Sequence, residues 1–133
     1  MDNDIVKIIA NTKQIAVVGF SRRPSRAGYY VPAYLQGAGY RIIPVNPYLD
    51  EALGETAYPD LTLIPDEVDL VLIFQRSENV PPFVDQAIAI GAKAIWMQLG
   101  IANEAAAAKA RDAGLDVVQD ACMMVEHRRQ GRQ

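Results

Sequence analysis

Short apolar runs alternate along the chain with longer stretches in which apolar residues recur at helical spacing. The apolar runs predict strands at Ile15–Gly19, Arg41–Asn46, Asp69–Phe74, Ala94–Gln98 and Asp116–Gln119. The helical spacing predicts a short helix at Asp4–Ala10 and longer ones near Val31–Ala38, from Pro81–Pro82 to Gly91, and from the cap residue Asn103 to Gly114. Strands that alternate with helices predict a doubly wound α/β fold, with a parallel five-stranded sheet and helices on both faces.

Prolines and glycines refine this pattern. Pro32 is placed in the first turn of its predicted helix, where a missing N–H costs least. Pro44 lies inside the second strand, which predicts that this strand is at an edge of the sheet or carries a bulge. Residues 47–68 are polar and interrupted by proline and glycine, so we expect an irregular excursion there with one helical turn.

Composition limits the classes of protein to which the chain could belong. Its 133 residues suit one domain over residues 1–133, and no apolar run approaches the ~20 residues of a membrane span. The net charge of -3 and the pI of 5.1 argue against a nucleic-acid partner. With one cysteine, Cys122, and one histidine, His127, the chain can form neither an internal disulfide nor a His/Cys zinc site. Because the chain has one cysteine and its N-terminus lacks a signal-peptide pattern, we expect a cytoplasmic protein.

The ligand site of a doubly wound sheet lies beyond the carboxyl ends of its strands, where the strand order reverses. This rule selects the segments Gly19–Ser21, Asn46–Pro47, Phe74–Ser77 and Gln98–Ile101. We therefore expect these four segments to meet around one ligand.

Three arginines follow the first of these turns in the stretch IAVVGFSRRPSRAG. Arg22, Arg23 and Arg26 lie between a strand that ends at Gly19 and the start of a helix, in a chain that is acidic overall. Free backbone N–H groups at a helix start and forked guanidinium donors both suit phosphate oxygens. The stretch predicts a site for a phosphate-bearing ligand, with Arg26 nearest the helix start; a solvated loop is the alternative interpretation.

The turn does not have the glycine spacing of the common dinucleotide sites. GFSRRPSRAG lacks G-x-G-x-x-G, and the second strand ends in Asn46-Pro47 where an NAD site would offer Asp or Glu to the ribose. No Walker A sequence occurs either. Because arginines can hold the extra phosphate of NADP, an NADP-dependent oxidoreductase or nucleotide sensor remains an alternative.

The motifs GFS, PVNP, LGI and DACMMVEHRR occur in this order around an apolar third strand. In this the chain resembles the small bacterial coenzyme A-binding proteins of the CoA-binding domain family, over about residues 13–129. It is also similar to the N-terminal domain of the succinyl-CoA synthetase alpha subunit. The resemblance implies a Rossmann-like domain that holds coenzyme A or an acyl-CoA across its strand ends.

Carried over by position, the resemblance implies contacts to three parts of the coenzyme. The pyrophosphate would lie against Gly19, Phe20 and Ser21. The adenosine would lie between Val45, Asn46 and Pro47 on one side and Phe74, Gln75, Arg76 and Ser77 on the other, and the pantetheine arm along Gln98, Leu99, Gly100 and Ile101. The synthetase domain has a lysine after its second-strand proline, where this chain has Tyr48, Leu49 and Asp50. Arg22, Arg23 or Arg26 would then take over the 3′-phosphate.

The resemblance does not extend to catalysis. The synthetase works through a phosphorylated histidine in a further domain and through a partner subunit, whereas His127 lies in the basic stretch EHRRQGR, which we expect to be a solvated tail. No nucleophile with its base is visible. We therefore expect a coenzyme A-binding protein that is not catalytic by itself. An accessory subunit of an acyl-CoA synthetase or ligase, with an unknown protein partner, is the second alternative.

Overall fold

The computed structural model describes residues 2–130, with side chains from residue 4 onward. The elements are α1 (Asp2–Asn11), β1 (Gln14–Val18), α2 (Ala27–Gly37), β2 (Arg41–Val45), β3 (Glu51–Ala52), β4 (Glu55–Thr56), the 3-10 turn η1 (Leu61–Leu63), β5 (Leu70–Ile73), the 3-10 turn η2 (Ser77–Asn79), α3 (Val80–Ala89), β6 (Ala94–Met97), α4 (Glu104–Asp112), β7 (Asp116–Val118) and α5 (Met123–Arg129). The five predicted strands and four predicted helices occur in the predicted order, and the structure adds β3, β4 and α5. No described helix is long and apolar enough to cross a membrane.

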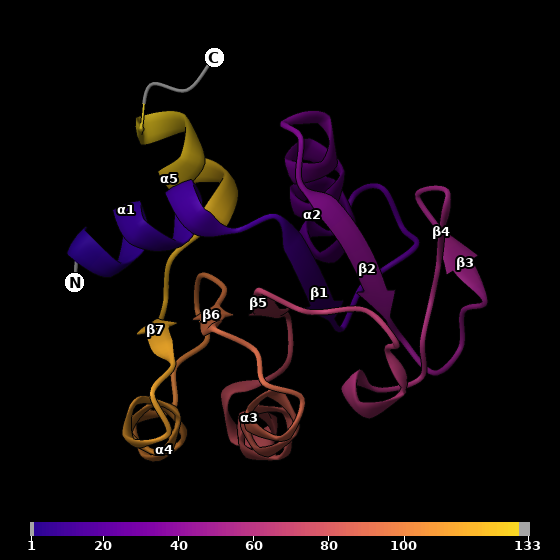
Figure 1. The fold of residues 1–133 in the computed structure, drawn as a ribbon. Helices are drawn as coiled ribbons and strands as arrows, with labels where there is room; N and C mark the ends of the chain where they lie inside the picture. The colour runs from indigo at the N-terminus through magenta and orange to yellow at the C-terminus, as the bar shows by residue number, and fades with distance from the viewer. Residues whose placement is uncertain (1, 131–133) are drawn as a thin grey trace.

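The five longer strands form one parallel sheet in the order β2-β1-β5-β6-β7. From β1 the chain moves outward to β2 and then returns to β5 on the other side of β1, so the strand order reverses between β1 and β5. Figure 1 shows α3 and α4 on one face of the sheet and α1, α2 and α5 on the other. The predicted doubly wound, Rossmann-like α/β fold is confirmed.

The strands are buried on both faces, which explains why they read as continuous apolar runs. In β1, Ala16 and Val18 belong to the core beneath α3 and α4, whereas Ile15 and Val17 belong to the core beneath α1, α2 and α5. Trp96 in β6 is fully buried, and its indole N–H donates to the Ala121 carbonyl at 2.8 Å.

Pro44 lies in an edge strand, as predicted, because β2 is the last strand on its side of the sheet. The Pro44 carbonyl points away from β1 and accepts the Tyr58 N–H at 3.0 Å, and the Asn46 N–H donates to the Tyr58 carbonyl at 2.9 Å. The nitrogen of Pro44 lies on the same outer side, where no ladder bond is required of it.

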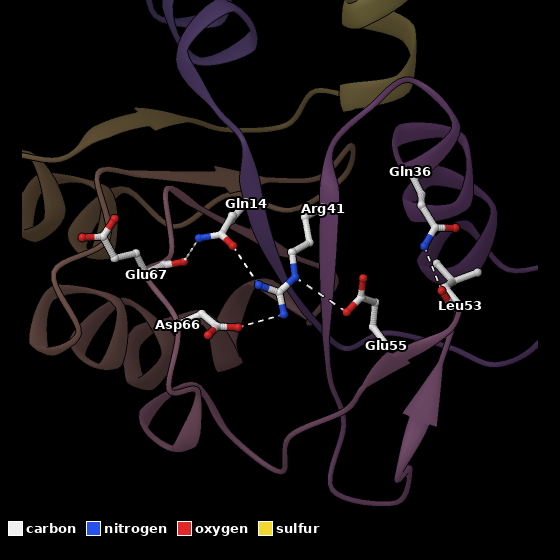
Figure 2. Close-up of polar contacts among 7 residues, drawn as sticks. All are labelled: Gln14, Gln36, Arg41, Leu53, Glu55, Asp66 and Glu67. Atoms are coloured by element: carbon white, nitrogen blue, oxygen red, sulfur yellow. Dashed lines mark hydrogen bonds and ion pairs between the residues drawn. The ribbon is translucent and has the colours of Figure 1, made fainter.

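The excursion at residues 47–68 holds a small antiparallel hairpin, β3–β4, in addition to the expected turn η1. Figure 2 shows how it is attached to the sheet. The Arg41 guanidinium lies 3.6 Å from Glu55 in β4 and 2.8 Å from Asp66, and it donates to the Gln14 side chain at 2.9 Å. A network at the start of β2 therefore ties the hairpin and the approach to β5 to the sheet.

Helix α2 begins earlier than predicted, at Ala27 rather than near Val31, which places Pro32 in the second turn. The sequence did not indicate this helix start because Arg26 is at the N-cap position, and arginine is not one of the usual capping residues. Arg26 makes no side-chain cap in the structure.

The expectation of a solvated C-terminal tail is wrong for the part that the structure describes. Residues 123–129 form α5, and His127 is buried against α2, where its Nδ1 lies 2.7 Å from the Tyr34 hydroxyl. The His127 ring also packs edge-on against Tyr34 and Tyr40. Burial raises the pKa of Tyr40, and the neighbouring Tyr34 raises it further. Arg132, the last arginine of the stretch, lies outside the described residues.

Candidate functional site

A cavity of about 400 Å³ opens where the strand order reverses, between the ends of β1, β5 and β6. Three of the four predicted segments meet in it. Its lining residues are Gly19, Ser21, Arg26, Ala27, Gly28, Phe74, Gln75, Arg76, Gln98, Leu99, Gly100 and Ile101.

The fourth segment, after β2, borders a second and more apolar cavity of about 310 Å³. It is lined by Val18, Gly19, Val45, Asn46, Pro47, Tyr48, Pro59, Gln75 and Phe83. Gly19 and Gln75 line both cavities, so the two adjoin at the strand ends, and together they are called the cleft below. Tyr48 stands at its rim with 89% of its surface exposed.

The β1–α2 turn is built on close backbone contacts. Gly19 has φ +80, and a Cβ there would lie 2.5 Å from the Phe74 carbonyl oxygen of β5's end. A Cβ on Gly28 would lie 3.0 Å from the Gly19 carbonyl, so the helix packs directly on the turn. Pro32 has no N–H for the Gly28 carbonyl four residues earlier, and that carbonyl instead accepts the Ser21 N–H at 3.1 Å. Glycine and proline together position the turn without the G-x-G-x-x-G spacing.

The rim of the larger cavity carries unbalanced positive charge. The N-terminus of α2 has no side-chain cap and no acidic residue in its first turn. Arg26 at this helix start and Arg76 in the loop after β5 line the cavity, whereas Arg22 and Arg23 do not, and all four side chains are exposed. Within the described part of the chain, none of these four arginines forms an ion pair. This arrangement suits an anion such as a phosphate.

Asn46 positions two of the loops. Its Nδ2 donates to the Phe20 carbonyl at 2.8 Å and its Oδ1 accepts the Tyr48 N–H at 2.7 Å. The side chain of Phe20 is buried in the core and packs edge-on against Tyr29. Asn46 therefore joins the turns after β1 and β2 at the floor of the cleft.

Ser77 and Gln98 join the loops on the other side of the cleft. The Ser77 Oγ accepts the Ala102 N–H at 3.0 Å, and its carbonyl accepts from Asn103 at 3.0 Å. The Gln98 Oε1 accepts the Met123 N–H at the start of α5, at 3.3 Å.

The structure thus brings most of the predicted site residues to one cleft. Those that line neither cavity are Phe20, Arg22, Arg23 and Ser77. The lining residues that sequence reasoning missed are Val18, Ala27, Gly28, Tyr48, Pro59 and Phe83. Two of these could have been identified from the sequence, because Gly28 ends the stretch RAG and Tyr48 directly follows Asn46-Pro47. Pro59 and Phe83 come from the excursion and from α3, and no motif marked them.

No group of three or more metal-ligating side chains that could hold a metal ion occurs among the residues that the structure describes.

Residues 13–128 match a family model described as a CoA binding domain. The chain belongs to the CoA binding domain family. The resemblance carried by the GFS, PVNP and LGI motifs is therefore confirmed.

Relatives of this CoA binding domain include both small proteins and a large enzyme. The uncharacterized protein YneT of Bacillus subtilis is 41% identical over 124 residues, 93% of this chain and 92% of that protein. A hypothetical protein from Pyrococcus horikoshii OT3 has a solved structure with a TM-score of 0.92 and 42% identity, covering 97% of this chain and 91% of that one. The ADP-forming acetate–CoA ligase II of Archaeoglobus fulgidus is 34% identical over 95 residues, which are 69% of this chain and 14% of the ligase.

Proposed function

We propose that this protein binds coenzyme A, or an acyl-CoA, along the carboxyl ends of its parallel strands and is not catalytic by itself. The observation that carries the proposal is the pair of adjoining cavities at the strand ends, which differ in chemistry. An apolar cavity suits the flat adenine ring, and the cavity bordered by Arg26 and Arg76 suits the phosphates and the arm that follows them. Membership of the CoA binding domain family supports the same ligand.

The proposed orientation follows from the charges. The pyrophosphate is expected beside Gly19 and Ser21, where the uncapped N-terminus of α2 presents its first N–H groups. The adenosine then lies toward Asn46 and Pro47, and the pantetheine arm runs past Gln98. Arg22 and Arg23 do not line the cleft but belong to the same exposed loop as Arg26, so they are the other candidates for the 3′-phosphate.

The absence of catalysis is proposed on the position of the single histidine. His127 lies in α5, buried against Tyr34 of α2, and does not line the cleft. The test is to incubate the purified chain with acetyl-CoA, ADP and phosphate and to measure the release of free thiol. Release above the rate in buffer would overturn this part of the proposal.

Thermal unfolding with coenzyme A, NADP, NAD and ADP at equal concentrations tests the ligand. Coenzyme A at about 100 times its Kd should stabilise the fold by about 2.7 kcal/mol, because it binds the folded state only. For a domain of this size that is roughly 8–14 °C in Tm. A shift with NADP and none with coenzyme A would instead support the oxidoreductase or sensor alternative and overturn the proposal.

Arg26→Ala tests the phosphate site. We expect its Kd for coenzyme A to rise about tenfold or more, because a charged hydrogen bond to phosphate contributes roughly 1.5–3 kcal/mol. Arg111→Ala is the matched control, since Arg111 is exposed near the end of α4, away from the cleft. Repeating both titrations with 3′-dephospho-coenzyme A assigns the contact: a smaller loss there places Arg26 on the 3′-phosphate, and an equal loss places it on the pyrophosphate. Equal affinities of Arg26→Ala and Arg111→Ala would contradict a phosphate contact.

A second candidate, an accessory subunit that supplies a coenzyme A site, is favoured by the match to one segment of an acetate–CoA ligase. The two candidates share the same ligand. They differ in whether the purified chain shows its full affinity for coenzyme A without another protein.

A cytoplasmic location belongs to the proposal as well, because one cysteine, Cys122, suits a reducing compartment.

A further inference from the structure

Gln98 is a buried polar side chain at the end of β6. Only 4% of its surface is exposed, although it lines the larger cavity of the cleft. Polar side chains buried to this degree normally have partners for both the oxygen and the nitrogen of their amide. The two ends of the Gln98 amide differ in this respect.

The oxygen is held by α5. The Met123 N–H can only donate, so the Gln98 amide atom that lies 3.3 Å from it is the oxygen. Three more hydrogen bonds fix the segment before α5 against the β6 loop: Trp96 to Ala121 at 2.8 Å, Gly100 to the Asp120 side chain at 2.7 Å, and Asp120 to Ile101 at 3.0 Å. The orientation of the Gln98 amide is therefore determined by a rigid contact behind the cleft.

The nitrogen has no such partner. Among residues 4–130 the Gln98 Nε2 makes no hydrogen bond. The Gln86 Oε1 is the one described side-chain atom that is both sealed from solvent and without a partner, so the Gln98 Nε2 keeps accessible surface, and the cavity that Gln98 lines is the larger one of the cleft. An NH₂ group placed this way presents donors, and no acceptor, to whatever occupies the cavity.

We propose that the Gln98 Nε2 donates a hydrogen bond to a carbonyl oxygen of the bound ligand, and that α5 acts as the element that orients it. The inference rests on the proposed function, because the pantetheine arm and its acyl group are the parts of the ligand expected there. Both offer carbonyl oxygens, in the two amides of the arm and in the acyl thioester. The site thus selects for an acceptor at this point and against a donor.

Gln98→Glu is the sharpest test, because it keeps the oxygen that Met123 contacts and replaces the NH₂ donors by a second oxygen. Isothermal titration would use coenzyme A, acetyl-CoA and 3′-phospho-ADP, which is the nucleotide part without the arm. We expect the ratio of the affinity for acetyl-CoA to that for 3′-phospho-ADP to fall about tenfold or more, since a donor is lost and two acceptors face each other. Gln75→Glu is the matched control: it places the same charge beside Gly19 and should weaken both ligands by the same factor.

The outcomes separate the carbonyls and the two proposals. A loss with both coenzyme A and acetyl-CoA assigns an amide of the arm, and a loss with acetyl-CoA alone assigns the thioester. An unchanged ratio for both ligands overturns the inference while leaving the proposed function intact. Failure of the unmodified protein to bind coenzyme A at all would overturn the proposed function.

A second measurement keeps the test decisive if Gln98→Glu does not fold. The side-chain NH₂ resonances of Gln98 can be assigned in the unmodified, ¹⁵N-labelled protein through their proximity to the Met123 N–H. We expect them to shift on addition of coenzyme A or acetyl-CoA and to stay in place with 3′-phospho-ADP. Resonances that do not respond to either arm-bearing ligand, under conditions where that ligand binds, overturn the inference.

Discussion

Replacing Gly19 by alanine tests the close contact on which the cleft is built. Gly19 has φ +80, and an added Cβ would lie 2.5 Å from the Phe74 carbonyl oxygen, where ordinary contact begins at 3.4 Å. The obstacle is main chain at the ends of β1 and β5, so it cannot rotate away as a side chain would. Gly91, which follows α3, is the matched control: it has φ +77 and nothing within 4 Å of the same added atom.

The difference between the two variants isolates the contact. A left-handed backbone costs an alanine roughly 1–2 kcal/mol, and this term is shared by both variants. The gain from stiffening the unfolded chain, about 0.4–1 kcal/mol, is shared as well. Moving the two strand ends apart adds a cost of about 1–3 kcal/mol in Gly19→Ala alone, by analogy with overpacked cores. We therefore expect a loss of about 3 kcal/mol for Gly19→Ala and about 1 kcal/mol for Gly91→Ala.

Urea unfolding followed by tryptophan fluorescence measures both losses, because Trp96 is the sole tryptophan and is fully buried. In thermal unfolding the two losses correspond to Tm shifts of roughly 9–15 °C and 3–5 °C. Losses that agree within about 0.5 kcal/mol, the usual scatter of independent sites, would refute the close-contact argument.

Two further predictions concern charges outside the cleft. Burial alone would raise the pKa of Asp69, but two backbone N–H groups at the start of β1, at 2.9 and 3.0 Å, and the Lys93 ammonium hold it below its ordinary value. Because this pKa is lowered in the folded state, the Asp69 carboxylate stabilises the protein above about pH 4, and this stabilisation is lost as the pH falls. Asp69→Asn should therefore cost about 1–2 kcal/mol at pH 7 and less at pH 3. A difference in unfolding free energy between the two proteins that stays constant with pH in urea unfolding would contradict this. Arg41→Met should cost about 1 kcal/mol or less, because its side chain is 41% exposed, yet it should speed amide hydrogen exchange at Asn46 by loosening the excursion. Lys109→Met, which breaks a 2.7 Å ion pair to Asp85 elsewhere, should leave that exchange unchanged.

Much of the fold could be predicted from the sequence because its strands are buried on both faces. A continuous apolar run such as Leu70–Ile73 is typical of a strand covered by helices on each side, and Pro44 correctly indicated the edge of the sheet. Elements held by long-range contacts were harder. Helix α5 reads as a charged tail, and what buries its His127 is Tyr34, 93 residues away in the chain. The β3–β4 hairpin turns at Leu53, which has φ 53, and leucine is not a residue type typical of such a turn position.

The candidate cleft divides in the same way. The rule for strand ends selects Gly19, Gln75 and Gln98 from sequence alone, because parallel strands end at one edge of the sheet. Pro59 and Phe83 enter only through packing of the excursion and α3, which no local pattern encodes. The donor character of Gln98 depends on α5, so it could not be predicted before that helix was known.

The bonds between β2 and Tyr58 also affect how copies of this protein behave at high concentration. An exposed sheet edge is a template on which another chain can add a strand, and such additions lead to aggregation. Here the outer edge of β2 has no N–H at Pro44, and Tyr58 already occupies the Pro44 carbonyl and the Asn46 N–H. The beginning of the same edge carries the charged Arg41 with its carboxylate partners. The excursion thus covers the β2 edge of the sheet and disfavours the addition of a neighbouring molecule's strand there.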